Sequence, residues 1–231
     1  MGANFKTCIG YQTVSYEGEI KDLCKLPLHL AKSVSFNSDL RDFQWLTTGY
    51  YFWMNSMIPA EKWMKLKEKR EKRLDEDITL GESNRYLIVK YEISIERDRV
   101  FDLIENPDDE KYLFELLDAY CRLYNESVKL GFGNELHKPS ISVVLHYFRE
   151  RQPDIFPYEA ITIADKYCSS EHWKYYNDEE RKSYLKILPL RAKGEEYKGV
   201  GRPQICVFEG LEDTLKNPEL MYPVEHSQIL E

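Results

Sequence analysis

This sequence of 231 residues lacks the long apolar runs that mark membrane proteins. No run approaches the ~20 apolar residues that a membrane-spanning helix needs. The N-terminal residues also lack the basic-then-apolar pattern of a secretory signal peptide. These absences predict a cytoplasmic protein that has no membrane partner.

The sequence is also poor in the patterns that hold disulfides, metals or phosphates. Its five cysteines are odd in number and include no Cys-x-x-Cys pair, and its five histidines show no metal-ligand spacing. No glycine-rich loop of the Rossmann or P-loop type is present. We therefore expect reduced thiols and no metal. Asp165, Cys168 and His172 permit a Cys-His-Asp hypothesis, but the family signatures of that chemistry are absent.

An excess of positive charge is missing as well. The formal net charge is -8 and the pI is near 5.3, which argues against a general nucleic-acid-binding protein, because such a protein needs a basic face. The mixed-charge run at 62–73 is typical of a solvated helix face, although contact between residues 65–72 and RNA or a partner protein stays open. What is present is a globular composition, with 42% apolar and 31% charged residues. This composition predicts one domain over residues 1–231, with 210–231 as a surface tail.

Strand and helix patterns alternate along the chain in the order of an α+β protein. The clearest strand is 85–95, where Leu87, Val89 and Tyr91 begin an apolar alternation. The clearest helix follows Asn106, a typical N-cap, and begins with Pro107. The other expected strands are 5–12, 45–53, 101–103, 160–164, 184–190 and 204–208. The other expected helices are 59–74, 139–151 and a weak one at 19–31 that Pro27 interrupts.

An aromatic segment gives the sequence a family resemblance. Residues 45–53 read Trp-Leu-Thr-Thr-Gly-Tyr-Tyr-Phe-Trp, which resembles the Trp-Leu-Gly-x-Gly-x-Tyr-Phe signature of bacterial ADP-ribosyltransferase-like proteins. These proteins share a superfamily with the poly(ADP-ribose) polymerases and diphtheria-type toxins. Residues 11–14 stand where this family has Tyr-His-Gly-Thr on its first strand, and residues 202–207 resemble its late strand His-x-Gln-Ile-Cys-Val.

The resemblance implies a fold, a substrate and a set of site residues. It implies split antiparallel sheets with flanking helices, NAD as substrate, and transfer of ADP-ribose to an unknown protein or nucleic-acid acceptor, as in many toxins and defence effectors. Gln12, Tyr51 and Gln204 take the catalytic roles: Gln12 holds a ribose hydroxyl, Tyr51 stacks on nicotinamide, and Gln204 orients the ribose. The further NAD-binding residues are then Thr13, Tyr50 and Trp63.

Three of these positions depart from the family pattern. Gln12 replaces a histidine, Thr13 replaces a glycine, and Arg202 replaces a histidine. A catalytically degenerate module that binds NAD, ADP-ribose or a partner protein is therefore the alternative function, and an unrelated α+β structural protein is the third.

Each residue also has a structural interpretation. The aromatic run at 50–53 is typical of a core, strand glutamines are usually structural or solvent-facing, and Trp63 suits helix packing. Cys206 is typical of a buried structural thiol.

Overall fold

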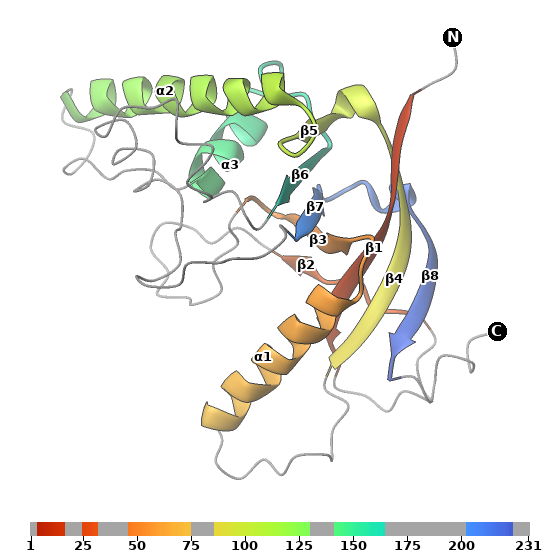
Figure 1. Cartoon of the computed structure of the whole chain (residues 1–231). Helices are drawn as coiled ribbons and strands as arrows, with labels where there is room; N and C mark the ends of the chain where they lie inside the picture. Colours follow the sequence, from red (N-terminus) through yellow and green to blue (C-terminus); the bar gives the residue numbers. More distant parts are fainter. Residues whose placement is uncertain are drawn as a thin grey trace.

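A computed structural model of the chain describes residues 4–16, 25–31, 46–74, 86–129, 141–164 and 202–223. Within these ranges the protein is α+β, with three α-helices and one mixed, eight-stranded sheet (Figure 1). The strands are β1 (Phe5–Ser15), β2 (Leu30–Ala31), β3 (Gly49–Met54), β4 (Tyr86–Glu96), β5 (Val100–Asp102), β6 (Ala160–Ala164), β7 (Pro203–Val207) and β8 (Leu215–Tyr222). The helices are α1 (Ile58–Leu74), α2 (Pro107–Lys129) and α3 (Ile141–Arg151), with 3-10 turns at Arg97–Arg99 and Glu212–Thr214.

The sheet splits beside the first strand. The strand order is β5-β6-β7-β3-β1-β4-β8, with β2 also paired to β3, and β5 and β6 are parallel while the other pairs are antiparallel. β1 pairs with β4 along its whole length but with β3 only at Gly10 and Tyr11. Because β7 occupies the other edge of β3, β2 and β1 share one edge, and β2 takes over where β1 departs. The split therefore begins at Gln12.

The two faces of the sheet carry different cores. On the face that we call the inner face, Tyr50 and Phe52 of β3 pack with alternate residues of β4 and with Val100 of β5. The predicted alternation of β4 is confirmed, because its inward residues are at most 4% exposed. Those inward residues are Leu87, Val89, Tyr91, Ile93 and Ile95.

All three helices cover the opposite face, which we call the helix face. There α2 and α3 pack on β5, β6 and β7, whereas Ala60 and Met64 of α1 pack on Tyr86 and Ile88 of β4. Figure 1 shows α2 and α3 beside β5 and β6, and α1 beside β1 at a different place along the sheet. The helix face thus has two separate helical layers.

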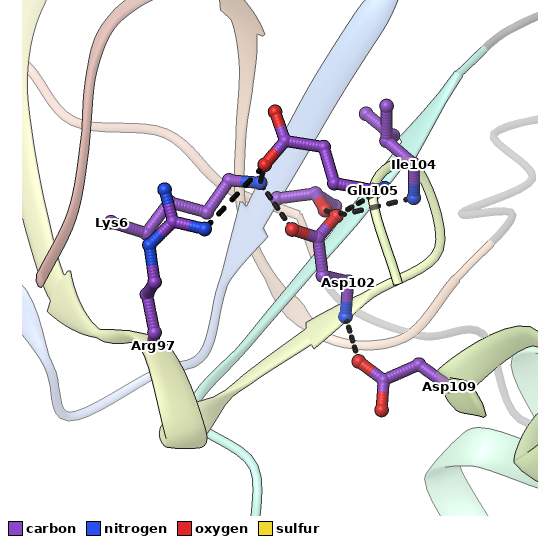
Figure 2. Close-up of polar contacts among 7 residues, drawn as sticks. Lys6, Arg97, Asp102, Ile104, Glu105 and Asp109 are labelled. Atoms are coloured by element: carbon purple, nitrogen blue, oxygen red, sulfur yellow. Dashed lines mark hydrogen bonds and ion pairs between the residues drawn. The ribbon is translucent and has the colours of Figure 1, made fainter. Parts of the chain in front are cut away.

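A buried polar cluster ties the first strand to the far edge of the sheet. Lys6 of β1 donates a hydrogen bond to Asp102 of β5, and Thr162 of β6 donates to the same carboxylate. The other carboxylate contacts come from the backbone N–H groups of Ile104 and Glu105, at 3.1 and 3.2 Å (Figure 2). Burial alone would raise the pKa of Asp102, but the Lys6 and Thr162 hydrogen bonds and the Lys6 charge hold the pKa below its usual value.

The long helix starts as its sequence predicts. The side chain of Asn106 accepts a hydrogen bond from the backbone N–H of Asp108 at 3.2 Å, and its carbonyl accepts one from Glu110 at 3.3 Å. These contacts satisfy two of the N–H groups that a helix start leaves without intrahelical partners. The N-cap prediction is confirmed.

Two expectations are wrong in the described residues. The helix expected at 19–31 is not helical over 25–31, where the chain instead enters β2, and residues 17–24 lie outside the described ranges. The surface tail expected at 210–231 contains β8, which pairs with β4 and buries Leu220 to 2% exposure. Four successive residues of β8 are exposed, so the strand shows little alternation of the kind that marks a buried strand. The strand expected at 184–190 lies outside the described ranges.

Candidate functional site

The residues predicted to bind NAD lie on neighbouring elements. β1, β3 and β7 are adjacent in the sheet, and α1 packs beside β1. Tyr51 is paired with Cys206, and Gln204 lies two residues before Cys206, so Tyr51 and Gln204 are diagonal neighbours on the helix face. Gln12 and Thr13 lie on β1, Tyr50 on β3 and Trp63 on α1.

Gln12 closes the split in the sheet from the inner face. Its amide accepts a hydrogen bond from the N–H of His29 at 2.8 Å and donates to the carbonyl of His29 at 2.9 Å and of Tyr51 at 3.3 Å. The two contacts with His29 replace the backbone pairing that β1 loses where it leaves β3. Gln12 is 4% exposed, so its amide acts within the protein as a bridge between strands.

The hydroxyl of Tyr51 has all its hydrogen bonds with the turn that precedes β3. Its hydroxyl donates to the carbonyl of Thr47 at 2.6 Å and accepts from the N–H of Thr47 at 2.9 Å and of Leu46 at 3.3 Å. Burial, reinforced by the neighbouring Cys206, raises the pKa of Tyr51 well above its usual value. The hydroxyl is therefore neutral, and it stabilises the turn that enters β3.

Tyr50 and Thr13 also have structural partners. Tyr50 points to the inner face, away from Gln204, and its hydroxyl donates to Glu212. Burial and this hydrogen bond raise the pKa of Tyr50 to about 12. The hydroxyl of Thr13 donates to the carbonyl of Ala60 at 2.9 Å and thereby attaches α1 to β1. A glycine at position 13 could not make this contact.

Gln204 differs from all of these residues. It is only 8% exposed, and its amide makes no hydrogen bond in the part of the chain that the structure describes. Among the described residues, the buried side-chain atom that lacks a hydrogen-bond partner is Oγ1 of Thr47, so the Gln204 amide keeps contact with solvent and is free to bind another group. A neutral amide can donate and accept hydrogen bonds but cannot take up a proton near neutral pH. Gln204 is thus suited to orienting a bound group.

The sequence motifs contain two further residues of this site that were given no role. Trp53 is paired directly with Gln204 of β7 on one side and with Tyr11 of β1 on the other. All three share the helix face, where β3 passes from the α2–α3 core, which includes Tyr51, to the α1 core, which includes Trp53 and Tyr11. Strand alternation in the motif could have placed Trp53 on the same face as Tyr51, but the pairing register could not be read from the sequence.

Trp63 and Cys206 lie at opposite extremes of burial. Trp63 is 36% exposed on α1. Cys206 is fully buried between β3 and β6, and burial raises the pKa of its thiol to about 12. Cys206 is therefore an unreactive, structural thiol, as its sequence context indicates.

Comparison of the chain with protein-family models, with curated proteins and with solved structures finds no match. None of the helices in the described ranges is both long and apolar enough to cross a membrane.

Proposed function

We propose that this protein is an NAD-dependent ADP-ribosyltransferase-like protein whose nicotinamide end binds on the helix face beside Gln204. The observation that carries the proposal is the amide of Gln204, a residue that is 8% exposed. This amide makes no hydrogen bond among the described residues, keeps contact with solvent, and lies one strand away from the split in the sheet. The motif resemblance predicts split antiparallel sheets with a hydrogen-bonding residue on a late strand, and the structure has one mixed sheet in which β1 and β3 pair only at Gly10 and Tyr11. The acceptor of ADP-ribose is then a protein or a nucleic acid.

Cleavage of the bond between nicotinamide and ribose depends more on how the ribose is oriented than on proton transfer. Nicotinamide leaves the ribose through a transition state in which positive charge develops on the sugar. An amide oxygen fixed beside that sugar stabilises the charge through its dipole and holds the ribose toward the acceptor. Gln204 supplies such an oxygen on a rigid, doubly paired strand, which limits its movement during the reaction.

Gln12 and Tyr51 support this site as positioning residues. Gln12 holds β1 to the segment at His29, and Tyr51 fixes the turn from which β3 begins. Together they set the place of Trp53 and Gln204 relative to the split. This assigns them a role through the backbone instead of the direct contacts with ribose and nicotinamide that the resemblance implies.

The test is nicotinamide release from labelled NAD by the purified full-length chain. We expect the Gln204→Ala variant to release nicotinamide about 100-fold more slowly, the usual effect of removing one such hydrogen-bonding group. Gln152→Ala is a matched control, because Gln152 lies after α3 and contacts Tyr147 at 3.4 Å. Equal release by wild type and Gln204→Ala would exclude the proposed site.

A second function is favoured by one specific observation. The side chains of Gln12 and Tyr51 are both committed to hydrogen bonds within the protein, so two of the three expected catalytic groups do not face a substrate. A module that binds NAD or ADP-ribose without turnover would need only Gln204. Isothermal titration calorimetry showing NAD binding, together with no nicotinamide release over hours, would favour this alternative.

A further inference from the structure

We propose that Tyr11, Trp53 and Gln204 form a platform that binds the nicotinamide ring of NAD, with Trp53 as the stacking surface in place of Tyr51. This inference rests on the proposed function and names the residues that recognise the substrate's aromatic end. The resemblance gave neither Trp53 nor Tyr11 a role.

The three side chains form a straight row across the sheet. Tyr11 pairs with Trp53, and Trp53 pairs with Gln204, so the row runs perpendicular to the strands. Neighbouring strands lie about 4.8 Å apart, and the row therefore spans roughly 10 Å. That length accommodates a planar ring on the central indole with its polar edge above the neighbouring amide.

The polar groups of these three side chains are all available to hydrogen-bond a ligand. Within the described residues, no hydrogen bond is made by the Tyr11 hydroxyl, the Trp53 indole N–H or the Gln204 amide. Tyr11 and Trp53 are partly exposed and Gln204 is 8% exposed, and the polar atoms of all three are absent from the buried, unpartnered side-chain atoms of the described residues, so a ligand can reach them. An aromatic surface that ends in an unpartnered amide matches a ring that carries a carboxamide, because the NH₂ group of Gln204 can donate to the carboxamide oxygen while its own oxygen stays directed toward the ribose.

The surroundings of the row distinguish Trp53 from Tyr51. Tyr51 packs into the core beneath α2 and α3, and its hydroxyl is bound by residues 46 and 47. Trp53 packs only at the margin of the smaller α1 core and makes no ring contact with another aromatic side chain in the described ranges. The Trp53 side chain thus packs against the protein and still keeps exposed surface.

The experiment is a titration of the full-length chain with three probes: NAD, nicotinamide, and ADP-ribose, which lacks the nicotinamide ring. Stacking on an aromatic side chain predicts that Trp53→Ala weakens NAD binding by about 10- to 100-fold. Nicotinamide binding should be lost, and ADP-ribose binding should change less than about 2-fold. Trp53→Phe keeps an aromatic face and should retain NAD affinity within about 5-fold of wild type.

Two controls keep the outcome interpretable. Trp53→Leu removes the aromatic face but fills much of the same space, and it serves if Trp53→Ala lowers the melting temperature too far. Tyr124→Ala removes an aromatic side chain from α2, where Tyr124 stacks on Tyr120, and should leave all three affinities unchanged.

The possible results separate this inference from the proposed function. Wild type that binds none of the probes would overturn both. Wild type that binds NAD, with Trp53→Leu and Trp53→Ala binding NAD equally well, would overturn the platform alone. Equal weakening of NAD and ADP-ribose by the Trp53 variants would also overturn it, because the row would then recognise a part of NAD other than nicotinamide.

Discussion

Two buried polar regions of this protein differ in how completely their hydrogen bonds are satisfied. At Asp102, every polar neighbour in the cluster is partnered, and the carboxylate receives hydrogen bonds from two side chains and two backbone groups. At Gln204, a side chain of similar burial makes no hydrogen bond among the described residues. A saturated cluster stabilises a fold, whereas an amide that has no partner in the described residues and keeps contact with solvent is free to bind another group.

The largest expected loss of stability comes from a substitution in the Asp102 cluster. Replacing Asp102 with alanine removes four hydrogen bonds and leaves Lys6, which is 6% exposed, without its main counter-ion. Lys6 keeps the exposed carboxylate of Glu105 at 3.3 Å, so we expect the free energy of unfolding to fall by about 3 kcal/mol, the lower end of the range for a buried charge that loses its partner. Urea unfolding followed by circular dichroism measures this loss.

The pH dependence of the same measurement tests the cause. The pKa of Asp102 in the folded protein lies below its ordinary value of 3.8. Its contribution is therefore fully present above that value and is lost as the pH falls through the folded-state pKa. The difference in the free energy of unfolding between wild type and Asp102→Ala should narrow below about pH 4.

An exposed ion pair serves as the control for the buried one. Lys90→Met breaks the exposed pair with Glu219 and should lower the free energy of unfolding by less than about 1 kcal/mol.

The second prediction compares two glutamines. Gln12→Ala removes the hydrogen bonds that Gln12 makes with the N–H and carbonyl of His29, and we expect a loss of about 1–3 kcal/mol. Gln204→Met removes an amide that has no hydrogen bond in the described residues, so we expect the free energy of unfolding to stay within about 0.5 kcal/mol of wild type. Thermal unfolding of both variants without NAD checks the difference. A clear destabilisation by Gln204→Met would mean that its amide has a structural partner, and the comparison would fail.

The sequence predicts the elements that depend on local signals better than the elements that depend on pairing with distant strands. Local signals predicted β4 and the start of α2, because alternation and an N-cap depend on residues within a few positions of one another. β8 and β2 depend on pairing with distant strands, and the exposed residues of β8 gave no apolar alternation. The motifs correctly drew attention to β1, β3 and β7, which the fold makes neighbours.

The roles of individual residues on those strands could not be predicted without the register in which the strands pair. Gln12, Tyr51 and Gln204 look equivalent in sequence, as polar or aromatic residues within matched motifs. The structure gives the first two internal partners and leaves the third open, because β2 occupies the split beside Gln12 and the turn at 46–48 closes over Tyr51. Such partners come from segments that the motifs do not define.

The last prediction compares two tyrosines on the helix face, of which Tyr11 has the smaller expected effect on stability. Tyr51→Phe removes a hydroxyl that makes three hydrogen bonds with residues 46 and 47, and leaving those backbone groups unpaired should cost about 1–3 kcal/mol. Tyr11→Phe removes a hydroxyl that has no hydrogen bond among the described residues, so its stability should stay within about 0.5 kcal/mol of wild type. NAD affinity should respond less to Tyr51→Phe than to Tyr11→Phe, since only the Tyr11 hydroxyl remains available beside Trp53. The opposite order in both measurements would place the ligand against Tyr51 and return the stacking role to it.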